Sequence, residues 1–344
     1  MRIGMLTGGG DAPGLNAAIR AVARPTLAAG DTVVGVRNGW AGLSGDGDLV
    51  EMTRRDVSGI LQLGGTILGS SRVNPMKDEG GLEVCLRNLR AAALDALVVI
   101  GGDDTLSVGA WLADQGAPVV GVPKTVDNDL SATDYCIGFD SAVSVVTEAL
   151  DRLHTTAASH HRVMVVEVMG RDTGWVAVMG GLAGGADMIL IPEYPVGLDE
   201  VVAHLDRRRA QGRDFSIIVV AEGVELDGMD RDSGEAVAAD AFGHVQLSKR
   251  GVGERLATMI EERTGNETRT TVLGHTQRGG SPTAYDRVWA TQVGTAAHGL
   301  VVEKRWGMMP VVRGGRVAVA RISEVVAEQR KVPRELYDLA RVFF

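Results

Sequence analysis

The sequence predicts an α/β protein built from doubly wound, mostly parallel sheets. Short apolar runs alternate along the chain with longer segments whose apolar residues recur at helical spacing, which is typical of parallel sheets flanked by helices. A length of 344 residues allows roughly two domains and the burial of about three quarters of the unfolded chain's surface. The 46 glycines indicate many tight turns and close backbone approaches between these elements.

Each element follows from its local pattern. Short apolar runs predict strands at 2–7, 32–36, 96–100, 118–122, 163–168, 188–192, 216–221 and 270–273. Helical spacing of apolar residues predicts helices at 16–27, 82–93, 141–153, 198–211, 253–263 and from beyond 282 to about 302. Pro25 marks a kink or the end of the first helix, and the polar stretch 225–249 is expected to be an exposed loop.

Charge and cysteine content exclude several classes of partner. A formal net charge of −9 and a pI near 5.3 argue against nucleic acid or an acidic membrane surface, since both require a basic face. Cys85 and Cys136 give neither a disulfide framework nor a ligand-spaced pair, so a reduced, cytoplasmic setting is expected. No apolar run approaches the ~20 residues that cross a bilayer, and the N-terminus reaches Gly8 without a signal-peptide core.

Two glycine-rich loops are candidates for binding an anion. Residues 8–14 lie between a predicted strand and a predicted helix, where consecutive backbone N–H groups can face an anion at the positive end of the helix. Such turns also serve simply to reverse the chain, and the residues alone leave both interpretations open. The loop 64–72 ends in Arg72 after many small residues, so its side chain could reach a phosphate unobstructed.

Acidic residues follow two neighbouring predicted strands. Asp127 and Asp129 stand in the stretch 123–129, and in an extended loop they would point the same way, one to take a proton and the other to help hold a metal. Asp103 and Asp104 follow the strand at 96–100. If the two strand ends are adjacent, four carboxylates come together, and such a cluster favours Mg²⁺. The alternative is that these aspartates only cap helices or solvate turns.

Basic residues are frequent in loops of the second half of the chain. They are Arg162, Arg171, Arg269, His275 and Arg278. Each one alone is typical of a solvated surface charge, but together, beside glycines and strand ends, they suit a phosphate monoester. The residues therefore predict an enzyme that brings a Mg²⁺-bound phosphoryl donor against a phosphorylated acceptor.

An ordered set of motifs resembles that of the 6-phosphofructokinases. The motifs span nearly the whole chain and are Gly8–Arg20, Gly101–Thr105, Pro123–Asp129, Met169–Arg171, Ala221–Gly223 and Gly274–Pro282. The resemblance implies two doubly wound domains of the phosphofructokinase type with the active site between them. The larger domain, 1–138 plus 277–330, would bind the phosphoryl donor and Mg²⁺. The smaller, 139–276 plus 331–344, would bind fructose 6-phosphate.

The resemblance also implies roles for individual residues in phosphoryl transfer. Asp127 would be the general base that takes the proton from the 1-hydroxyl of fructose 6-phosphate, and Asp103 with Asp129 would hold Mg²⁺. Thr125 would contact the sugar or the transferring group, while Gly9 and Arg72 would stabilise the charge that develops on that group. These roles agree with phosphoryl transfer as positioning plus electrostatics.

The remaining implied residues surround the acceptor, fructose 6-phosphate. The 6-phosphate would be held by Arg162, Arg269, His275 and Arg278, and the sugar would be lined by Met169, Gly170, Arg171 and Glu222 together with Thr125, Asp127 and Asp129. In the family Arg162 and Arg269 reach in from a neighbouring subunit, so the resemblance implies a homo-oligomer. Dimer and tetramer both remain open, as does acceptance of sedoheptulose 7-phosphate.

Position 104 indicates the phosphoryl donor. ATP-using members usually carry glycine there, whereas this chain has Asp104, beside Thr105 in the donor-binding turn. A carboxylate about 5 Å from a phosphate charge costs on the order of 3 kcal/mol at an effective dielectric near 20. Asp104 with Lys124 resembles the pyrophosphate-dependent branch, which predicts inorganic pyrophosphate as donor and a reversible step of glycolysis and gluconeogenesis.

Alternative functions also stand at this point. If Asp104 turns away to cap the helix that begins near Thr105, ATP remains acceptable as donor. A more distant alternative is a non-catalytic homologue that binds sugar phosphate and regulates a partner, although Asp103 and Asp127 argue against it.

Overall fold

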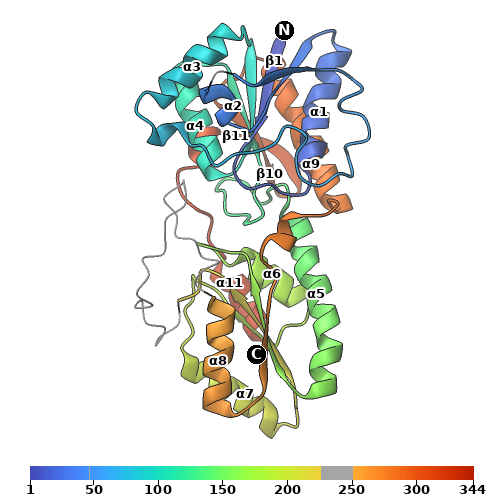
Figure 1. The fold of residues 1–344 in the computed structure, drawn as a ribbon, viewed down its shortest axis with the longest axis vertical. Helices are drawn as coiled ribbons and strands as arrows, with labels where there is room; N and C mark the ends of the chain where they lie inside the picture. Colours follow the sequence, from blue (N-terminus) through green and yellow to red (C-terminus); the bar gives the residue numbers. More distant parts are fainter. Residues whose placement is uncertain (46, 226–250) are drawn as a thin grey trace. The chain divides into compact units, whose positions relative to one another are not determined.

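The computed structural model describes residues 1–45, 47–225 and 251–344, and it divides into two compact units. The first unit comprises Met1–Ser141 and Arg278–Arg330, and the second comprises Ala142–Gln277 and Lys331–Phe344 (Figure 1). Apart from Glu225, the stretch 225–249 that was expected to be a loop lies outside the described residues. Within the described ranges, no helix is long and apolar enough to span a membrane.

The first unit contains a seven-stranded sheet in the order β11-β10-β5-β4-β1-β2-β3. Its strands are β1 (Arg2–Thr7), β2 (Thr32–Val36), β3 (Leu49–Met52), β4 (Ala96–Gly101), β5 (Val119–Pro123), β10 (Met308–Arg313) and β11 (Arg316–Arg321). The five central strands run parallel, and only the edge strands β3 and β11 pair antiparallel to their neighbours. The expected α/β class with mostly parallel sheets is confirmed.

Helices cover both faces of this sheet (Figure 1). One side carries α1 (Leu15–Ala28) and α9 (Ala284–Val302), and the other carries α2 (Ala41–Ser44), α3 (Gly81–Ala91) and α4 (Asp103–Asp114). The short α10 (Ile322–Val325) and a 3₁₀ turn, η1 (Pro75–Lys77), complete the unit. Every residue of β4 and β5 is buried, so these two strands form the centre of the core.

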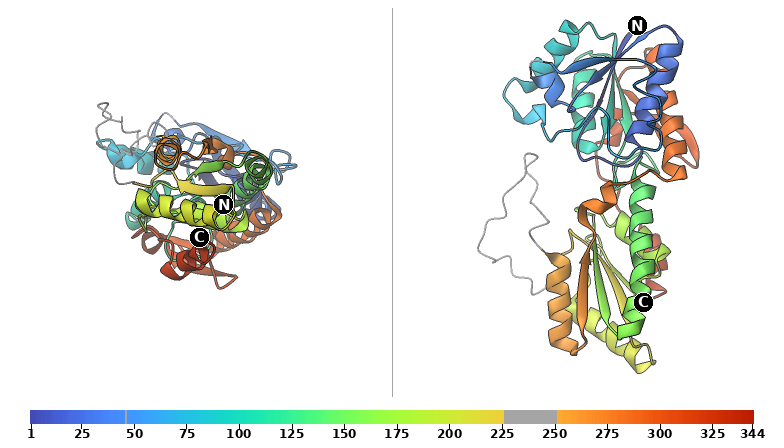
Figure 2. Two further views of the ribbon diagram at one scale, coloured as in Figure 1. Left: turned by 90° about the horizontal axis from the view of Figure 1, so that it is seen from below. Right: turned by 45° about the vertical axis from the view of Figure 1, so that its right-hand side comes forward.

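The second unit is a four-stranded parallel sheet in the order β7-β8-β6-β9, also covered on both faces (Figure 2). Its strands are β6 (Val163–Val168), β7 (Met188–Leu190), β8 (Ser216–Ala221) and β9 (Thr268–Val272). Its helices are α5 (Phe139–His160), α6 (Trp175–Ala183), α7 (Leu198–Ala210), α8 (Val252–Thr264) and α11 (Arg334–Arg341), with the 3₁₀ turn η3 (Gly274–Arg278) at the return to the first unit.

Most predicted elements are found, and the exceptions have physical causes. Helix α1 continues through Pro25 to Ala28, so the proline removes one hydrogen bond of the helix without ending it. Edge strand β3 was not expected, since only Met52 of its four residues is buried and Glu51 interrupts the apolar run. The hairpin β10–β11 was not expected either, although Gly314 and Gly315, both at positive φ, form the kind of two-residue turn that closes hairpins. Helix α6 was also missed.

Candidate functional site

Three adjacent strand ends place the acidic and glycine-rich turns of the first unit side by side. Strands β5, β4 and β1 are neighbours and run parallel, so their carboxyl ends share one edge of the sheet. The Gly8 amide donates to the Ile100 carbonyl at 3.0 Å, and the Lys124 amide donates to the Gly101 carbonyl at 3.0 Å. The strand order reverses between β1 and β4, which is where open α/β sheets bind their ligands.

Glycine at two positions lets the first turn of α4 approach the glycine turn 8–14. A Cβ atom added to Gly8 would lie 2.6 Å from the Thr105 side chain, and one added to Gly101 would lie 2.4 Å from Thr105 Cβ. Thr105 is buried in the space that these two glycines leave. The glycine turn therefore rests directly on the start of α4, where the helix dipole is positive.

Lys124 is a buried cation held beneath the glycine turn. Its side chain is 2% exposed, and Nζ donates to the carbonyl oxygens of Gly8 at 3.0 Å and Gly10 at 2.5 Å. Burial, reinforced by the charge of Arg278, lowers the pKa of Lys124 to about 7, while Asp11 and Asp127 oppose the shift. The residue can therefore exchange its proton near neutral pH, unlike an ordinary lysine.

Arg278 lies across the same glycine turn. Its Nη1 donates to the Asp11 carbonyl at 3.0 Å, and a Cβ atom on Gly10 would come within 2.4 Å of that nitrogen. Two basic groups, Arg278 and Lys124, thus face one turn of the first unit. His275, which the sequence grouped with Arg278, precedes it in the second unit.

The loop 64–72 is tied to the glycine turn by buried polar side chains. Asn16, buried in α1, donates to the Gly64 carbonyl at 3.0 Å and accepts from the Ile67 amide at 2.8 Å. The Ser70 hydroxyl donates to the Gly9 carbonyl at 2.5 Å. Exposed Arg72 follows two residues later, so its loop ends next to the turn. Nothing in the sequence alone marks Asn16 or Ser70, because neither carries an obvious chemical role.

The loop after β5 bends at Asn128. This residue adopts φ of 52°, so the loop is not extended, and alternation cannot direct Asp127 and Asp129 to the same side as expected. Its side chain accepts from the Cys136 amide at 2.9 Å, which closes the loop on itself. The Asp127 amide donates to Thr125 Oγ1 at 3.1 Å, whereas Asp129 Oδ2 accepts from the Gln329 amide group at 3.4 Å.

The carboxylates do not form a metal cage built by protein alone. Among the described residues, no group of three or more His, Cys, Asp or Glu side chains is arranged to hold a metal ion, so the expected cluster of four is absent. Mg²⁺ in phosphoryl-transfer sites is usually bound by one or two carboxylates together with substrate phosphates and water. Asp103, exposed in the first turn of α4 at the shared edge, fits such a partial site.

Four of the predicted sugar-binding residues meet at the carboxyl edge of the second sheet. Met169, Gly170 and Arg171 follow β6, and Glu222 follows the adjacent strand β8. The Glu222 amide donates to the Val168 carbonyl at 2.9 Å, and Gly170 adopts φ of 143°, which favours glycine. His275 follows β9 at the same edge. Buried Gln277 also belongs here, since its Oε1 accepts from the Met169 amide at 3.3 Å.

Arg162 and Arg269 lie at the opposite edge of that sheet. Arg162 directly precedes β6, and Arg269 is the second residue of β9, paired with Met164. A six-residue strand is about 20 Å long, so neither arginine can join Arg171 or His275 within one chain. The predicted basic cluster is therefore split, and its members from a single chain do not form one site.

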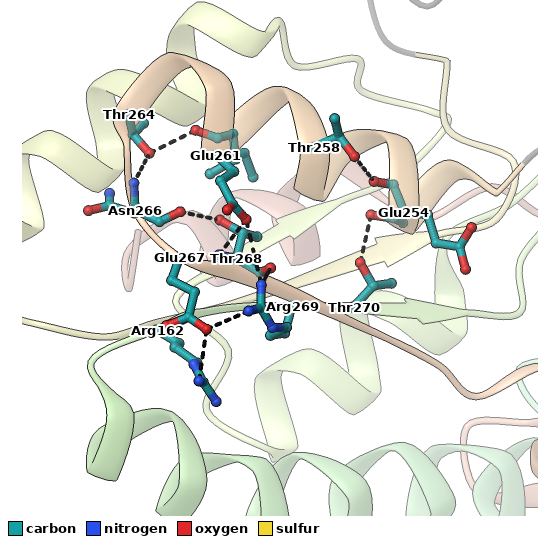
Figure 3. A network of polar contacts seen from close by, with 12 residues as sticks. Arg162, Glu254, Thr258, Glu261, Thr264, Asn266, Glu267, Thr268, Arg269 and Thr270 are labelled. Carbon is teal, nitrogen blue, oxygen red and sulfur yellow. Dashed lines mark hydrogen bonds and ion pairs between the residues drawn. The ribbon is translucent and has the colours of Figure 1, made fainter.

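Glu267 bridges the two arginines at this amino edge (Figure 3). Its Oε1 accepts from Arg162 Nη2 at 2.8 Å and from Arg269 Nη2 at 2.5 Å. The Nε atoms of Arg162 and Arg171 are buried and have no hydrogen-bond partner among the described residues.

Comparison with known proteins gives a consistent result over the whole chain. A family model described as Phosphofructokinase matches residues 2–301. A pyrophosphate–fructose 6-phosphate 1-phosphotransferase of Amycolatopsis methanolica is 54% identical over 348 residues, covering 100% of both chains. An ATP-dependent 6-phosphofructokinase of Corynebacterium efficiens is 47% identical over 347 residues, covering 100% of this chain and 99% of the other. The solved structure of a pyrophosphate-dependent phosphofructokinase from Marinobacter aquaeolei has a TM-score of 0.82 at 25% identity, covering 100% of this chain and 91% of that one.

Proposed function

We propose that this chain, which belongs to the phosphofructokinase family, transfers a phosphoryl group from inorganic pyrophosphate to the 1-hydroxyl of fructose 6-phosphate. The product is fructose 1,6-bisphosphate, and the reaction is readily reversible. The observation that carries the proposal is the shared edge of β5, β4 and β1, where Lys124, Asp104 and the glycine turn come together. One relative named for pyrophosphate is 54% identical, and one named for ATP is 47% identical.

Asp104 and Lys124 select the donor. Asp104 lies in the first turn of α4, whose cap position is Gly102, so Asp104 is not the capping residue. The start of α4 also lies close to the segment after β5, because a Cβ atom on Gly102 would be 3.5 Å from the Lys124 carbonyl oxygen. The negative charge of Asp104 repels the additional phosphate of a nucleotide. Lys124 and Thr105 bind the shorter pyrophosphate.

Asp127 acts as the general base. The hydrogen bond from its own amide to Thr125 Oγ1 fixes the turn that carries its carboxylate, so the base is positioned before the substrate arrives. Gly9 and Arg72 stabilise the charge of the transferring phosphoryl group, and Lys124 adds a cation from below the turn. Asp103 with Asp129 would hold Mg²⁺, which supplies charge neutralisation on the phosphates when bound.

The acceptor site is completed by a second copy of the chain. Met169, Gly170, Arg171 and Glu222 surround the sugar, and His275 and Arg278 approach its 6-phosphate. Arg162 and Arg269 contribute from the neighbouring subunit, which accounts for their place at the opposite edge of the sheet. The active form is therefore a homo-oligomer.

The enzyme works in the cytoplasm, where free buried thiols such as those of Cys85 and Cys136 remain reduced.

Initial rates with fructose 6-phosphate and Mg²⁺ test the donor. We expect turnover with pyrophosphate and not with ATP, and we expect Asp104→Gly to admit ATP. Asp104→Asn keeps the size of the side chain and removes its charge, so it separates repulsion from bulk. Asp127→Ser should lose turnover and retain fructose 6-phosphate binding. Turnover of the unaltered enzyme with ATP alone would overturn the choice of donor, and a fully active Asp127→Ser would overturn the mechanism.

Subunit complementation tests the shared site. Arg162→Ser and Asp127→Ser should each be nearly inactive as pure proteins. Co-expression should restore part of the activity, because a mixed oligomer contains sites in which neither residue is altered. A mixture as inactive as its components would show that both residues serve the site of one chain.

A further inference from the structure

A carboxylate occupies the place between the two arginines that are proposed to bind the 6-phosphate. One oxygen of Glu267, Oε1, accepts from both guanidinium groups, at 2.8 Å from Arg162 and 2.5 Å from Arg269 (Figure 3). Arginine pairs bind phosphate oxygens by the same charge-assisted contacts. Glu267 Oε1 thus makes the kind of contacts with this arginine pair that a phosphate oxygen would make.

From this geometry we propose that Glu267 is an internal counter-ion of the phosphate subsite, which it occupies when empty and yields to the sugar phosphate, so that its charge lowers the affinity for substrate. This inference rests on the proposed function. The side chains of Arg162, Glu267 and Arg269 are 28%, 41% and 51% exposed, so a ligand can reach them and Glu267 can move away. A phosphate monoester carries up to two negative charges and three free oxygens, and it therefore replaces a singly charged carboxylate.

The basic groups around Glu267 favour its ionised form, and Glu267 is the carboxylate that contacts both arginines of this subsite. His160 at the end of α5 adds a third basic group, and Arg162, Arg269 and His160 together lower the pKa of Glu267, with the hydrogen bond from Arg162 as the largest cause. Glu267 is therefore ionised at neutral pH. The other nearby carboxylate, Glu261 on α8, accepts from the Thr268 amide at 3.1 Å and lies 3.7 Å from Arg269. It contacts one arginine and is already engaged with the backbone.

The variant Glu267→Gln tests the negative charge of this side chain separately from its role in holding the two arginines in place. Glutamine keeps an acceptor oxygen at the same distance along the side chain, so it can still hold the two guanidinium groups together without repelling phosphate. Glu262→Gln is the matched control, because it removes the same charge from an exposed position on α8. All the altered side chains are at least partly exposed, so both variants should fold.

The experiment measures KM and kcat for fructose 6-phosphate at low and high salt, with calorimetric binding of fructose 6-phosphate and inorganic phosphate in parallel. We expect Glu267→Gln to lower KM and both dissociation constants roughly three- to tenfold at low salt, with less difference at high salt and kcat within about twofold. Glu262→Gln should match the unaltered chain. An unchanged or raised KM, or an equal effect in the control, would overturn the role of Glu267.

The calorimetric arm separates this inference from the proposed function. If the chain shows no turnover but binds fructose 6-phosphate or inorganic phosphate more tightly in Glu267→Gln, the counter-ion role stands and the proposed activity fails. If turnover is normal and neither binding constant changes, the proposed activity stands and the counter-ion role fails.

Discussion

The hydroxyl of Tyr135 donates a 2.5 Å hydrogen bond to the buried carboxylate of Asp286, in the first turn of α9. The same carboxylate accepts from the Gly138 amide at 2.6 Å and from the Ser141 amide and hydroxyl at 2.9 and 2.6 Å. Next to Gly138, the Ile137 amide donates to the Pro123 carbonyl at 3.2 Å. Asp286 therefore holds the far end of the loop that carries Asp127.

We expect Asp286→Asn to lower both stability and kcat. An amide nitrogen in place of either oxygen faces a backbone N–H, which leaves a buried donor unpaired and costs about 1–3 kcal/mol of unfolding free energy. Urea denaturation and initial rates measure the two effects. Asp338→Asn is the control, because Asp338 forms an exposed ion pair with Arg334 at 2.9 Å. Its loss should change the free energy of unfolding by less than about 0.5 kcal/mol. Equal stability of the two variants would refute the anchoring role.

Lys124 should give the enzyme a distinctive pH profile. Because its pKa is lowered to about 7, the free enzyme carries a cation below that pH and a neutral amine above it. We therefore expect kcat/KM for pyrophosphate to fall about tenfold per pH unit above neutrality, whereas kcat declines only at higher pH because bound phosphate holds the proton. Lys124→Arg keeps its charge over this range. A profile with the same inflection in Lys124→Arg would assign the titration to another group.

Because Gly8 and Thr105 are in contact, we expect substitutions at the two positions to have non-additive effects on the free energy of unfolding. Gly8→Ala places a methyl group 2.6 Å from the buried Thr105 side chain and should cost about 1–3 kcal/mol of unfolding free energy. Thr105→Ala removes the atoms at 2.6 Å and leaves Cβ at 3.2 Å, so the double variant should be more stable than the sum of the single effects predicts. Strict additivity in urea denaturation would mean that the turn relaxes away from α4.

The sequence predicts most of the core of this fold because most of its buried strands are short apolar runs. The strands at 2–7, 32–36, 163–168 and 216–221 have the predicted bounds, whereas β11 has three half-buried positions and β10, although four of its residues are buried, contains Pro310. Local patterns therefore fail where a strand is partly in solvent or carries a proline.

The sequence predicts those residues of the candidate site that lie directly before or after a recognisable strand. Arg162 precedes an apolar run and Arg171 follows it, so the separation of the two arginines was already present in the order of residues along β6. By contrast, the burial of Asp286 accompanies hydrogen bonds from Tyr135, Gly138 and Ser141, which lie far from it along the chain. No local pattern in a single sequence reports such contacts.

His204 should make the second unit sensitive to acid. It is buried on α7, with its ring 6.3 Å from that of Phe344, and burial, together with Arg208 and Arg207, lowers its pKa to about 4. An unfolded histidine gains its proton near pH 6.5, so between pH 6.5 and 4 the unfolded chain binds more protons and stability falls as the pH falls. We expect a loss of about 2 kcal/mol between pH 7 and pH 5 in urea denaturation. His204→Gln should reduce that loss, whereas His161→Gln, at an exposed position, should not. An unchanged pH dependence in His204→Gln would place the acid sensitivity elsewhere.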